Sequence, residues 1–428
     1  MSGFNYEKDA DGIVTVTMDM DGPVNSMNEE YRQCMADTVQ KLQQEDGLTG
    51  VVLASAKKVF FAGGNLHELL ATTEEDIPGF MEVMHRTKAE LRALEKLPVP
   101  VVAAINGAAL GGGFEICLSC NHRIAWNIRI VQLGLPEVTL GLLPGGGGVV
   151  RMVNLLGLQT ALPYLLEGTR VTPDKALAAG MIHETVDTVE ELVPRAKAWI
   201  LENKDNEAAA VQPWDVKGFK IPGGNAAHPA NAQMISVAPA MLYQKTRGLL
   251  PAPAKILDCA IEAARLDLDT ALVVESRGLA HLVVTPQAKN QISTFFFGMN
   301  KVNGGASRPQ EVEPQQTKKV GILGAGMMGQ GIAYVSAMAG IEVVLKDISQ
   351  EAADKGKAYS EKLLARRVER GRMDQAKMDG ILALIKPTAD AADLQGCDLI
   401  IEAVFENMAL KHQITKEMQG YMAEGGVW

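Results

Sequence analysis

The chain has 428 residues and a formal net charge of -10. At roughly 150 residues per domain, this length favours two or three domains over a single core. The acidic balance argues against a nucleic-acid-binding protein, because phosphate binding needs clustered basic residues.

No targeting, membrane or metal-binding segment is predicted. Residues 1–11 are polar and lack the basic-then-apolar pattern of a signal peptide. The apolar stretch 98–118 is interrupted by polar residues and glycines, so it fits a buried strand, turn and helix better than a membrane span. Cys117 and Cys120 form a C-x-x-C pair without the second pair or histidine cluster of a zinc site. The five cysteines are odd in number and scattered, which favours reduced thiols in a cytoplasmic protein.

The first part of the chain alternates strand and helix patterns. Residues 12–19 alternate like a half-buried strand, and residues 28–45 form an amphipathic helix pattern. Further strands are predicted over residues 50–54 and 99–105. Because no hairpin signal separates these elements, the pattern predicts right-handed crossovers and an α/β architecture.

Two glutamates follow glycine or proline at the ends of apolar runs. Glu115 follows Gly111–Gly113, and Glu137 follows Pro136, shortly before the glycine run Gly145–Gly148. Such positions present a side chain from the end of a strand or the first turn of a helix. A carboxyl group there can have a pKa shifted for proton transfer. The structural alternative is a helix N-terminal charge, which is the commoner role of one isolated glutamate after a glycine run.

Four glycine-containing motifs follow one another in the first part of the chain. They are Phe60-Phe61-Ala62-Gly63-Gly64-Asn65, Ala103-Ala104-Ile105-Asn106-Gly107-Ala108-Ala109-Leu110-Gly111-Gly112-Gly113-Phe114-Glu115, Gly134-Leu135-Pro136-Glu137 and Leu143-Pro144-Gly145-Gly146-Gly147-Gly148. In this order they resemble the enoyl-CoA hydratase/isomerase (crotonase) superfamily. The resemblance covers residues 1–190 and implies a spiral of repeated ββα units.

The resemblance implies a catalytic role for both glutamates. In that family the residues at the positions of Glu115 and Glu137 share a water and add it to a 2-trans-enoyl-CoA, giving an L-3-hydroxyacyl-CoA. Which of them is acid and which is base stays open. The amides of Gly64 and Gly112 would stabilise negative charge on the thioester oxygen, which glycine allows to approach closely. Asn65 stands where many members have aspartate, a difference expected to affect the turn rather than the chemistry.

Two other functions remain open for this region. Enoyl-CoA isomerisation needs one carboxylate and the same backbone donors. A non-catalytic scaffold would hold acyl-CoA or a partner without chemistry. The presence of both glutamates favours hydration.

Residues 191–303 are predicted as a helical extension, and residues 304–317, rich in glycine, proline and glutamine, as a linker. The aromatic run Phe295–Phe297 is explained most simply by core or interface packing. Resemblance to multifunctional β-oxidation proteins instead implies that its helix caps the hydratase pocket, with Asn300 near the substrate. Helices are predicted over residues 189–203, 254–266 and 286–300, and a loop over residues 212–224.

A second constellation starts at residue 318. The apolar strand pattern 319–323 leads into Gly324-Ala325-Gly326-Met327-Met328-Gly329 and a helix pattern, and the next strand pattern ends at Asp347. Placed between strand and helix, with an acid after the next strand, G-x-G-x-x-G is a dinucleotide-binding fingerprint. The glycines bring the pyrophosphate to the helix N-terminus. Asp347 would bind the adenosine ribose and repel a 2′-phosphate, which favours NAD over NADP.

Residues 318–428 resemble a partial Rossmann domain, the NAD-binding domain of L-3-hydroxyacyl-CoA dehydrogenases. The alternative for Glu406 and Lys411 is a solvated ion contact at a helix start. Other helix and strand patterns lie at residues 358–372 and 397–402. The cofactor residues that the resemblance implies are Gly324, Gly326, Met328, Gly329, Asp347, Phe405, Glu406 and Lys411.

Hydratase followed by dehydrogenase is the order found in α-subunits of bacterial fatty-acid β-oxidation complexes, where the hydrated product is the substrate of the oxidation. This resemblance implies a thiolase β-subunit and a homo-oligomer as possible partners. Residues 425–428 resemble the start of a fifth Rossmann strand, ahead of the family's catalytic histidine and helical C-terminal domain. The sequence therefore predicts a chain that hydrates enoyl-CoA and does not oxidise the product.

Overall fold

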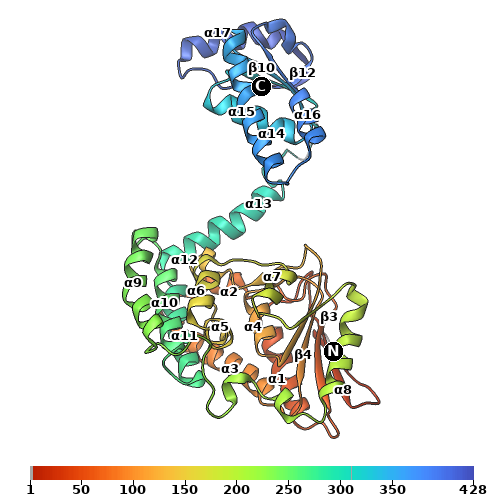
Figure 1. The fold of residues 1–428 in the computed structure, drawn as a ribbon, viewed down its shortest axis with the longest axis vertical. Helices are drawn as coiled ribbons and strands as arrows, with labels where there is room; N and C mark the ends of the chain where they lie inside the picture. Colours follow the sequence, from red (N-terminus) through yellow and green to blue (C-terminus); the bar gives the residue numbers. More distant parts are fainter. Residues whose placement is uncertain (1–2, 310) are drawn as a thin grey trace. The chain divides into compact units, whose positions relative to one another are not determined.

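A computed structural model describes residues 3–309 and 311–428 of the chain. Clustering of the chain's internal contacts gives two compact units, Met1–Ser307 and Arg308–Trp428 (Figure 1). The region 191–303 therefore lies within the same unit as the residues before it. Among the described residues, no helix combines the length and the apolar character needed to cross a bilayer.

The first unit is built on a six-stranded sheet of order β1-β2-β3-β4-β6-β8. All neighbours are parallel except β1 and β2, which form an antiparallel pair. The three predicted strands are present, whereas β1 was not predicted because its sequence lacks an apolar alternation. The strands are β1 (Gly3–Lys8), β2 (Ile13–Asp19), β3 (Gly50–Ser55), β4 (Val101–Ile105), β6 (His122–Trp126) and β8 (Glu184–Val186).

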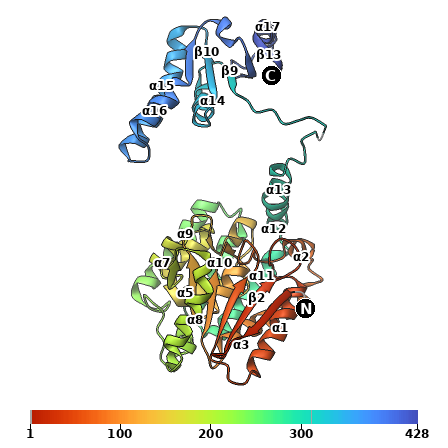
Figure 2. The same cartoon turned by 90° about the vertical axis from the view of Figure 1, so that its right-hand side faces the viewer.

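Helices cover both faces of this sheet (Figure 2). On one face Ile13 and Val52 pack with Ile200 of α8. On the other face Val14 and Leu53 join the core formed with α1 and α3. Successive strand residues point to opposite faces, so β2 and β3 are apolar on both sides. The helices are α1 (Glu29–Gln43), α3 (Ile77–Glu95) and α8 (Leu192–Asn203).

A small second sheet pairs β5 with β7 in parallel and positions the short elements around them. The glycine runs seen in the sequence lie at the turns between these elements. The elements are α2 (Leu66–Ala71), β5 (Ala109–Leu110), α4 (Gly112–Leu118), β7 (Leu133–Gly134), the 3-10 helix η1 (Glu137–Leu140), α5 (Gly148–Leu156), α6 (Leu158–Glu167) and α7 (Pro173–Ala178).

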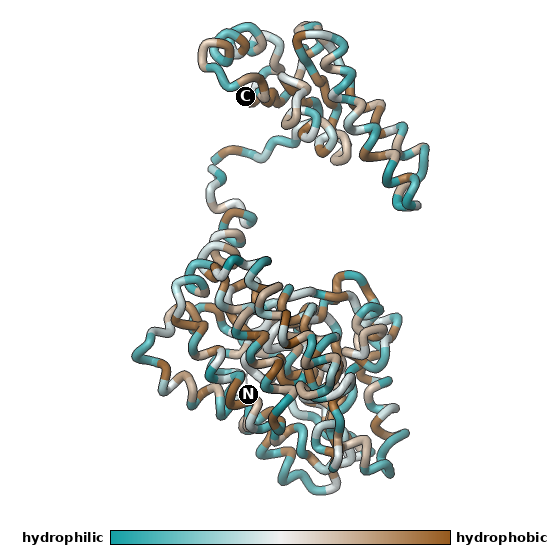
Figure 3. The backbone as a smooth tube through the Cα atoms, turned by 60° about the vertical axis from the view of Figure 1, so that its left-hand side comes forward, coloured by the Kyte–Doolittle hydropathy of each residue, from teal (hydrophilic) through white to brown (hydrophobic). Residues whose placement is uncertain are grey.

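The helices after residue 203 complete the core of the first unit. Helix α10 packs against α5 and α6, and α11 packs against α3 and α5. Figure 3 shows hydrophobic segments running through the interior of this unit. The predicted helix 286–300 is present, with a π-helical middle. The elements are α9 (Pro229–Thr246), α10 (Pro251–Ala263), α11 (Leu268–Val283), α12 (Pro286–Gln291), the π-helix η5 (Ile292–Gly298) and α13 (Met299–Asn303).

The second unit is a parallel five-stranded sheet of order β11-β10-β9-β12-β13. Strand order reverses between β9 and β12, which is the doubly wound arrangement of nucleotide-binding sheets. The helix predicted from residue 358 begins earlier, and the predicted fifth strand begins at Met422. The elements are β9 (Lys319–Leu323), α14 (Met327–Met338), β10 (Glu342–Lys346), α15 (Gln350–Glu369), α16 (Gln375–Ala383), β11 (Ile385–Thr388), β12 (Cys397–Glu402), α17 (Met408–Met418) and β13 (Met422–Val427).

Candidate active site

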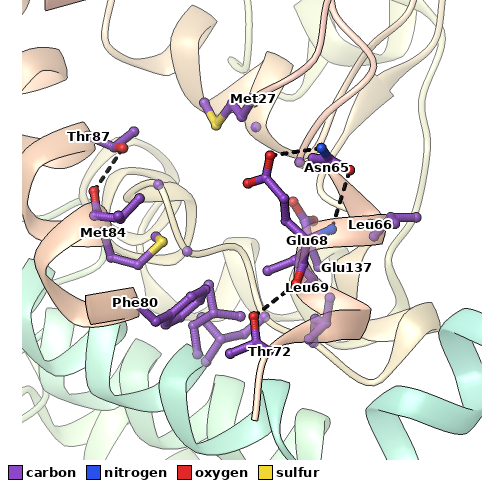
Figure 4. A pocket seen from close by; sticks show the side chains of 18 of the residues that line it. Met27, Asn65, Leu66, Glu68, Leu69, Thr72, Phe80, Met84, Thr87 and Glu137 are labelled. Carbon is purple, nitrogen blue, oxygen red and sulfur yellow. Dashed lines mark hydrogen bonds between the residues drawn. The ribbon is translucent and has the colours of Figure 1, made fainter. Parts of the chain in front are cut away.

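A cavity of about 390 Å³ lies in the first unit and brings together the four residues singled out for hydration. Glu115, Glu137, Gly64 and Gly112 all line it. Most other lining side chains are apolar, and Figure 4 shows several of them around Glu137. Concave, mostly apolar sites with a few convergent polar groups are typical of small-molecule binding. The two glutamates therefore share one void, although they come from different elements.

Glu115 is buried in the first turn of α4 and is held through one oxygen. Its Oε1 accepts hydrogen bonds from the amides of Gly146 and Gly148, each over 2.7 Å. Both amides belong to the N-terminus of α5 and have no acceptor within that helix. Oε2 has no hydrogen bond to any described residue. One oxygen thus fixes the carboxyl group, and the other stays available to a ligand.

Glu137 opens the 3-10 helix η1 directly after Pro136. Its Oε2 is buried and has no hydrogen-bond partner among the described residues. At Gly111, φ is +55°, and a Cβ there would lie 2.6 Å from Glu137 Oε1. Any other residue at this position would therefore clash with the Glu137 carboxyl group. A buried polar atom without a partner is costly. Glu137 is therefore poised to bond a water or ligand in the cavity.

Burial raises the pKa of both carboxyl groups. The pKa of Glu115 is raised to about 7, first by desolvation and then by the negative charge of Glu275. The pKa of Glu137 is raised well above its usual range, first by desolvation and then by Glu115. The two groups interact, so their proton affinities belong to the pair. A pKa near neutrality suits a group that both accepts and donates a proton at physiological pH.

The amides of Gly64 and Gly112 are free to bind a ligand. Neither donates a hydrogen bond to another described residue. The segment before α2 is fixed by a parallel bridge in which the Met27 amide donates to Gly63 over 2.9 Å and Asn65 donates back to Met27 over 3.3 Å. Two unpaired backbone donors on the wall of a cavity can stabilise a developing oxyanion.

Asn65 serves the turn, as the sequence predicted. Its Oδ1 accepts from the amide of His67 over 3.0 Å, which caps α2. Its Nδ2 donates to Glu68 Oε1 over 2.9 Å. An aspartate could make the cap but not this second bond, because a carboxylate has no donor.

Three charged residues near the cavity had no local signal in the sequence. Glu275 of α11 and Lys88 of α3 form a buried ion pair of 2.9 Å beside Glu115. Lys289 of α12 donates to the carbonyl groups at the end of α2. Their positions depend on contacts between residues 184 to 220 apart in the chain, which neither periodicity nor motif spacing encodes.

Asn300 does not reach the cavity. It is exposed and is absent from the cavity lining. Phe297 of the same helical stretch packs on α2, with its ring centroid 4.4 Å from that of His67. Phe295 remains 60% exposed. The aromatic run therefore packs through Phe297, while Phe295 stays largely exposed. A substrate contact by Asn300 stays a prediction.

The second unit has the geometry of a dinucleotide cradle. Gly324 has φ of +98°, and a Cβ on Gly329 would collide with the Gly324 carbonyl. Open space surrounds Gly326, and the free amides of α14 begin directly after it. Asp347 Oδ2 accepts the Ala325 amide over 2.6 Å, so the acid lies against the glycine loop. These residues fit NAD, whose pyrophosphate would lie at the helix N-terminus.

The remaining predicted cofactor residues lie at the start of α14, in the turn after β12 and in the first turns of α17. Met328 and Phe405 are 63% and 85% exposed. Lys411 Nζ lies 2.9 Å from Glu406 and 3.1 Å from Glu402. Glu402, which the sequence did not indicate, also accepts the Val404 amide over 2.7 Å and so shapes the strand end. The ion contact and the cofactor role of Lys411 are compatible.

Comparison with known families agrees with both units. Residues 8–215 match the enoyl-CoA hydratase/isomerase family, and residues 319–427 match the NAD-binding domain of 3-hydroxyacyl-CoA dehydrogenase. The chain is therefore a crotonase-type domain fused to a 3-hydroxyacyl-CoA dehydrogenase NAD-binding domain. The α/β fold class predicted from the sequence is confirmed.

Curated relatives match the chain across both units. The chain is 35% identical over 421 residues to the fatty acid oxidation complex subunit alpha of Shewanella halifaxensis, covering 97% of this chain and 58% of the relative. It is 34% identical over 432 residues to that of Shewanella frigidimarina, covering 99% and 59%. The chain thus spans somewhat over half the length of these relatives. In fold it resembles the enoyl-CoA hydratase from Bacillus halodurans, with a TM-score of 0.50, 22% identity, and coverage of 68% and 100%.

Proposed function

We propose that the first unit hydrates 2-trans-enoyl-CoA to L-3-hydroxyacyl-CoA in fatty-acid oxidation. The observation that carries the proposal is one cavity lined by Glu115, Glu137 and the unpaired amides of Gly64 and Gly112. The thioester carbonyl would accept the two amides, which stabilise the enolate oxygen. Water held between the carboxyl groups would add at C3, while one carboxyl accepts a proton from the water and the other protonates C2.

The test is hydration of crotonyl-CoA by the full chain and by Glu115→Gln and Glu137→Gln. Each change keeps the shape of the side chain but removes its ionisation, so kcat should fall by about 10²-fold or more. Glu82→Gln, on the exposed side of α3, is the matched control and should retain activity. Unchanged trace activity in all variants would instead support a non-catalytic acyl-CoA-binding scaffold. Conversion of a 3-enoyl-CoA that survives in one of the two site variants would indicate isomerisation.

The second unit belongs to the same proposal. Gly324, Gly326, Gly329 and Asp347 would hold NAD, which supplies hydride acceptance when bound, and Met328, Phe405, Glu406 and Lys411 would complete the cofactor site. The product of hydration is the alcohol that such a cofactor oxidises. We propose the dehydrogenase step for the whole protein, by analogy with the curated relatives.

Assembly is proposed from the relatives' name, which describes a complex with more than one kind of subunit. By the resemblance of the sequence, the second subunit would be a thiolase, and the chain could also self-associate. A cytoplasmic location is proposed with it, because five scattered cysteines, an odd number, fit reduced thiols better than a disulfide framework. Co-purification of a thiolase activity with the full protein from its host would test the assembly.

A further inference from the structure

The N-terminus of α5 is shared by two carboxylates. The amides of Gly146 and Gly148 bind Glu115, whereas two neighbouring amides bind Glu275. The Gly147 amide donates to Glu275 Oε1 over 2.7 Å, and the Val150 amide donates to Glu275 Oε2 over 3.1 Å. Glu115 comes from α4 and Glu275 from α11. The glycine turn is therefore clamped between two helices that are distant in sequence, and each carboxylate takes alternate donors of one helix start.

Lys88 balances the charge of Glu275. Its Nζ lies 2.9 Å from Glu275 Oε1 and donates to Ser276 Oγ over 2.8 Å and to the Leu272 carbonyl over 2.6 Å. An ammonium group has three donors, and all three are used. Lys88 is 4% exposed and Glu275 is fully buried. Lys88 is therefore committed to Glu275 and its neighbours, and none of the described lysines or arginines forms an ion pair with Glu115.

Resting on the hydratase function proposed above, we propose that Glu275, with Lys88 as its counter-ion, is a positioning residue that orients Glu115 and controls its proton transfer. Without a carboxylate at 275, the amides of Gly147 and Val150 lose at least one of their two charged acceptors, and the turn is held less firmly. The two amides that aim Glu115 Oε1 would then lose their alignment. Glu275 itself is absent from the cavity lining, so it acts through the turn and through its charge.

The surrounding charges determine the direction of the electrostatic effect. Desolvation and the negative charge of Glu275 raise the pKa of Glu115, whereas Lys88 and Arg151 lower it. Removing the charge at 275 while Lys88 remains would leave a net cation nearby and lower the pKa of Glu115. The groups facing Glu115 are Tyr31 on α1, Lys88 on α3, Glu137 on η1, Arg151 on α5 and Glu275 on α11.

The experiment compares the full chain with Glu275→Gln and with the double variant Glu275→Gln/Lys88→Met. In Glu275→Gln we expect kcat for crotonyl-CoA to fall by about tenfold with little change in KM, and the acidic limb of the kcat/KM profile to move down by about one pH unit. The double variant removes both buried charges, which often restores stability. Its melting temperature should recover, while its kcat should stay low. The exposed pair Glu167 and Lys245 supplies the matched control, Glu167→Gln, with a wild-type profile.

Wild-type kcat and pH profile in the folded double variant would overturn the proposal, and so would a kcat that recovers in step with the melting temperature. If Glu275→Gln does not fold, the double variant decides alone. If the wild-type chain does not hydrate crotonyl-CoA, the proposed function fails separately. An infrared titration of the Glu115 carboxyl group, assigned by difference against Glu115→Gln, then still decides. An unshifted midpoint in Glu275→Gln, where Lys88 remains, would contradict the role of Glu275.

Discussion

Arg151 and Glu95 form a fully buried ion pair, with 2.6 Å between Arg151 Nε and Glu95 Oε1. Arg151 Nη1 also donates to the Gly146 carbonyl over 2.9 Å. On its other oxygen Glu95 binds Arg92, which reaches Asp215 at 2.8 Å. A chain of charges thus leads from a partly exposed carboxylate to the glycine turn that holds Glu115. The turn is braced through its carbonyl as well as through its amides.

The first prediction concerns this pair. Glu95→Gln leaves the guanidinium of Arg151 buried without a counter-charge. Removing one partner of a buried ion pair typically costs about 3–5 kcal/mol. We expect the free energy of unfolding to fall by that amount in urea denaturation. Lys245→Met, which breaks an exposed pair, should change it by about 0–1 kcal/mol. Equal effects of the two changes would contradict the bracing role of Glu95.

Site residues with partners nearby in the chain could be predicted from the sequence, whereas those with distant partners could not. Glu115 and Glu137 stand beside glycine and proline, and such local signals can be recognised in one sequence. Glu275 and Lys88 stand within ordinary helical patterns, because their partners are supplied by tertiary packing. The hairpin strand β1 was missed because an edge strand with one half-exposed face carries little apolar alternation.

The second prediction concerns the pH dependence of stability. Burial and Glu275 raise the pKa of Glu115 from an ordinary 4.5 to about 7. In the unfolded chain this carboxyl group ionises at the lower pH. Its contribution to the free energy of unfolding is therefore fully present below pH 4.5 and is lost as the pH rises towards 7. The loss assigned to this group is about 3 kcal/mol.

Glu115→Gln cannot ionise and should escape this loss. Urea unfolding at several pH values should therefore show the variant gaining stability relative to wild type, by up to about 3 kcal/mol between pH 4.5 and pH 8. Glu82→Gln, which is exposed, should show no such trend. A constant difference between Glu115→Gln and wild type across this range would contradict the raised pKa.

The third prediction concerns Lys289. Its Nζ donates to the carbonyls of Leu69, Leu70 and Thr72 over 2.8, 2.7 and 2.5 Å, and so caps the C-terminus of α2. Helix α2 begins two residues after Gly64, so its anchorage holds one proposed oxyanion donor in place. In Lys289→Met these carbonyls lose charged donors, worth about 1.5–3 kcal/mol each at most.

Faster amide hydrogen exchange should then appear in residues 66–72, together with a several-fold lower kcat for crotonyl-CoA. Lys301→Met is the matched control, because Lys301 lies on the exposed helix α13. Unchanged exchange in residues 66–72 would show that packing of η5 on α2 suffices to hold this helix.

The fourth prediction concerns the second unit. Asp347 lies against the glycine loop through the Ala325 amide, and by the resemblance its carboxylate would bind the adenosine ribose of NAD. Asp347→Ala removes a charged acceptor, so the Kd for NAD measured by calorimetry should rise by at least about tenfold. The affinity for NADP should fall less or rise, because the repulsion of the 2′-phosphate disappears. Asp354→Ala, on the exposed side of α15, should bind NAD as wild type does. If Asp347→Ala keeps both the affinity for NAD and the preference over NADP, the carboxylate does not select the cofactor.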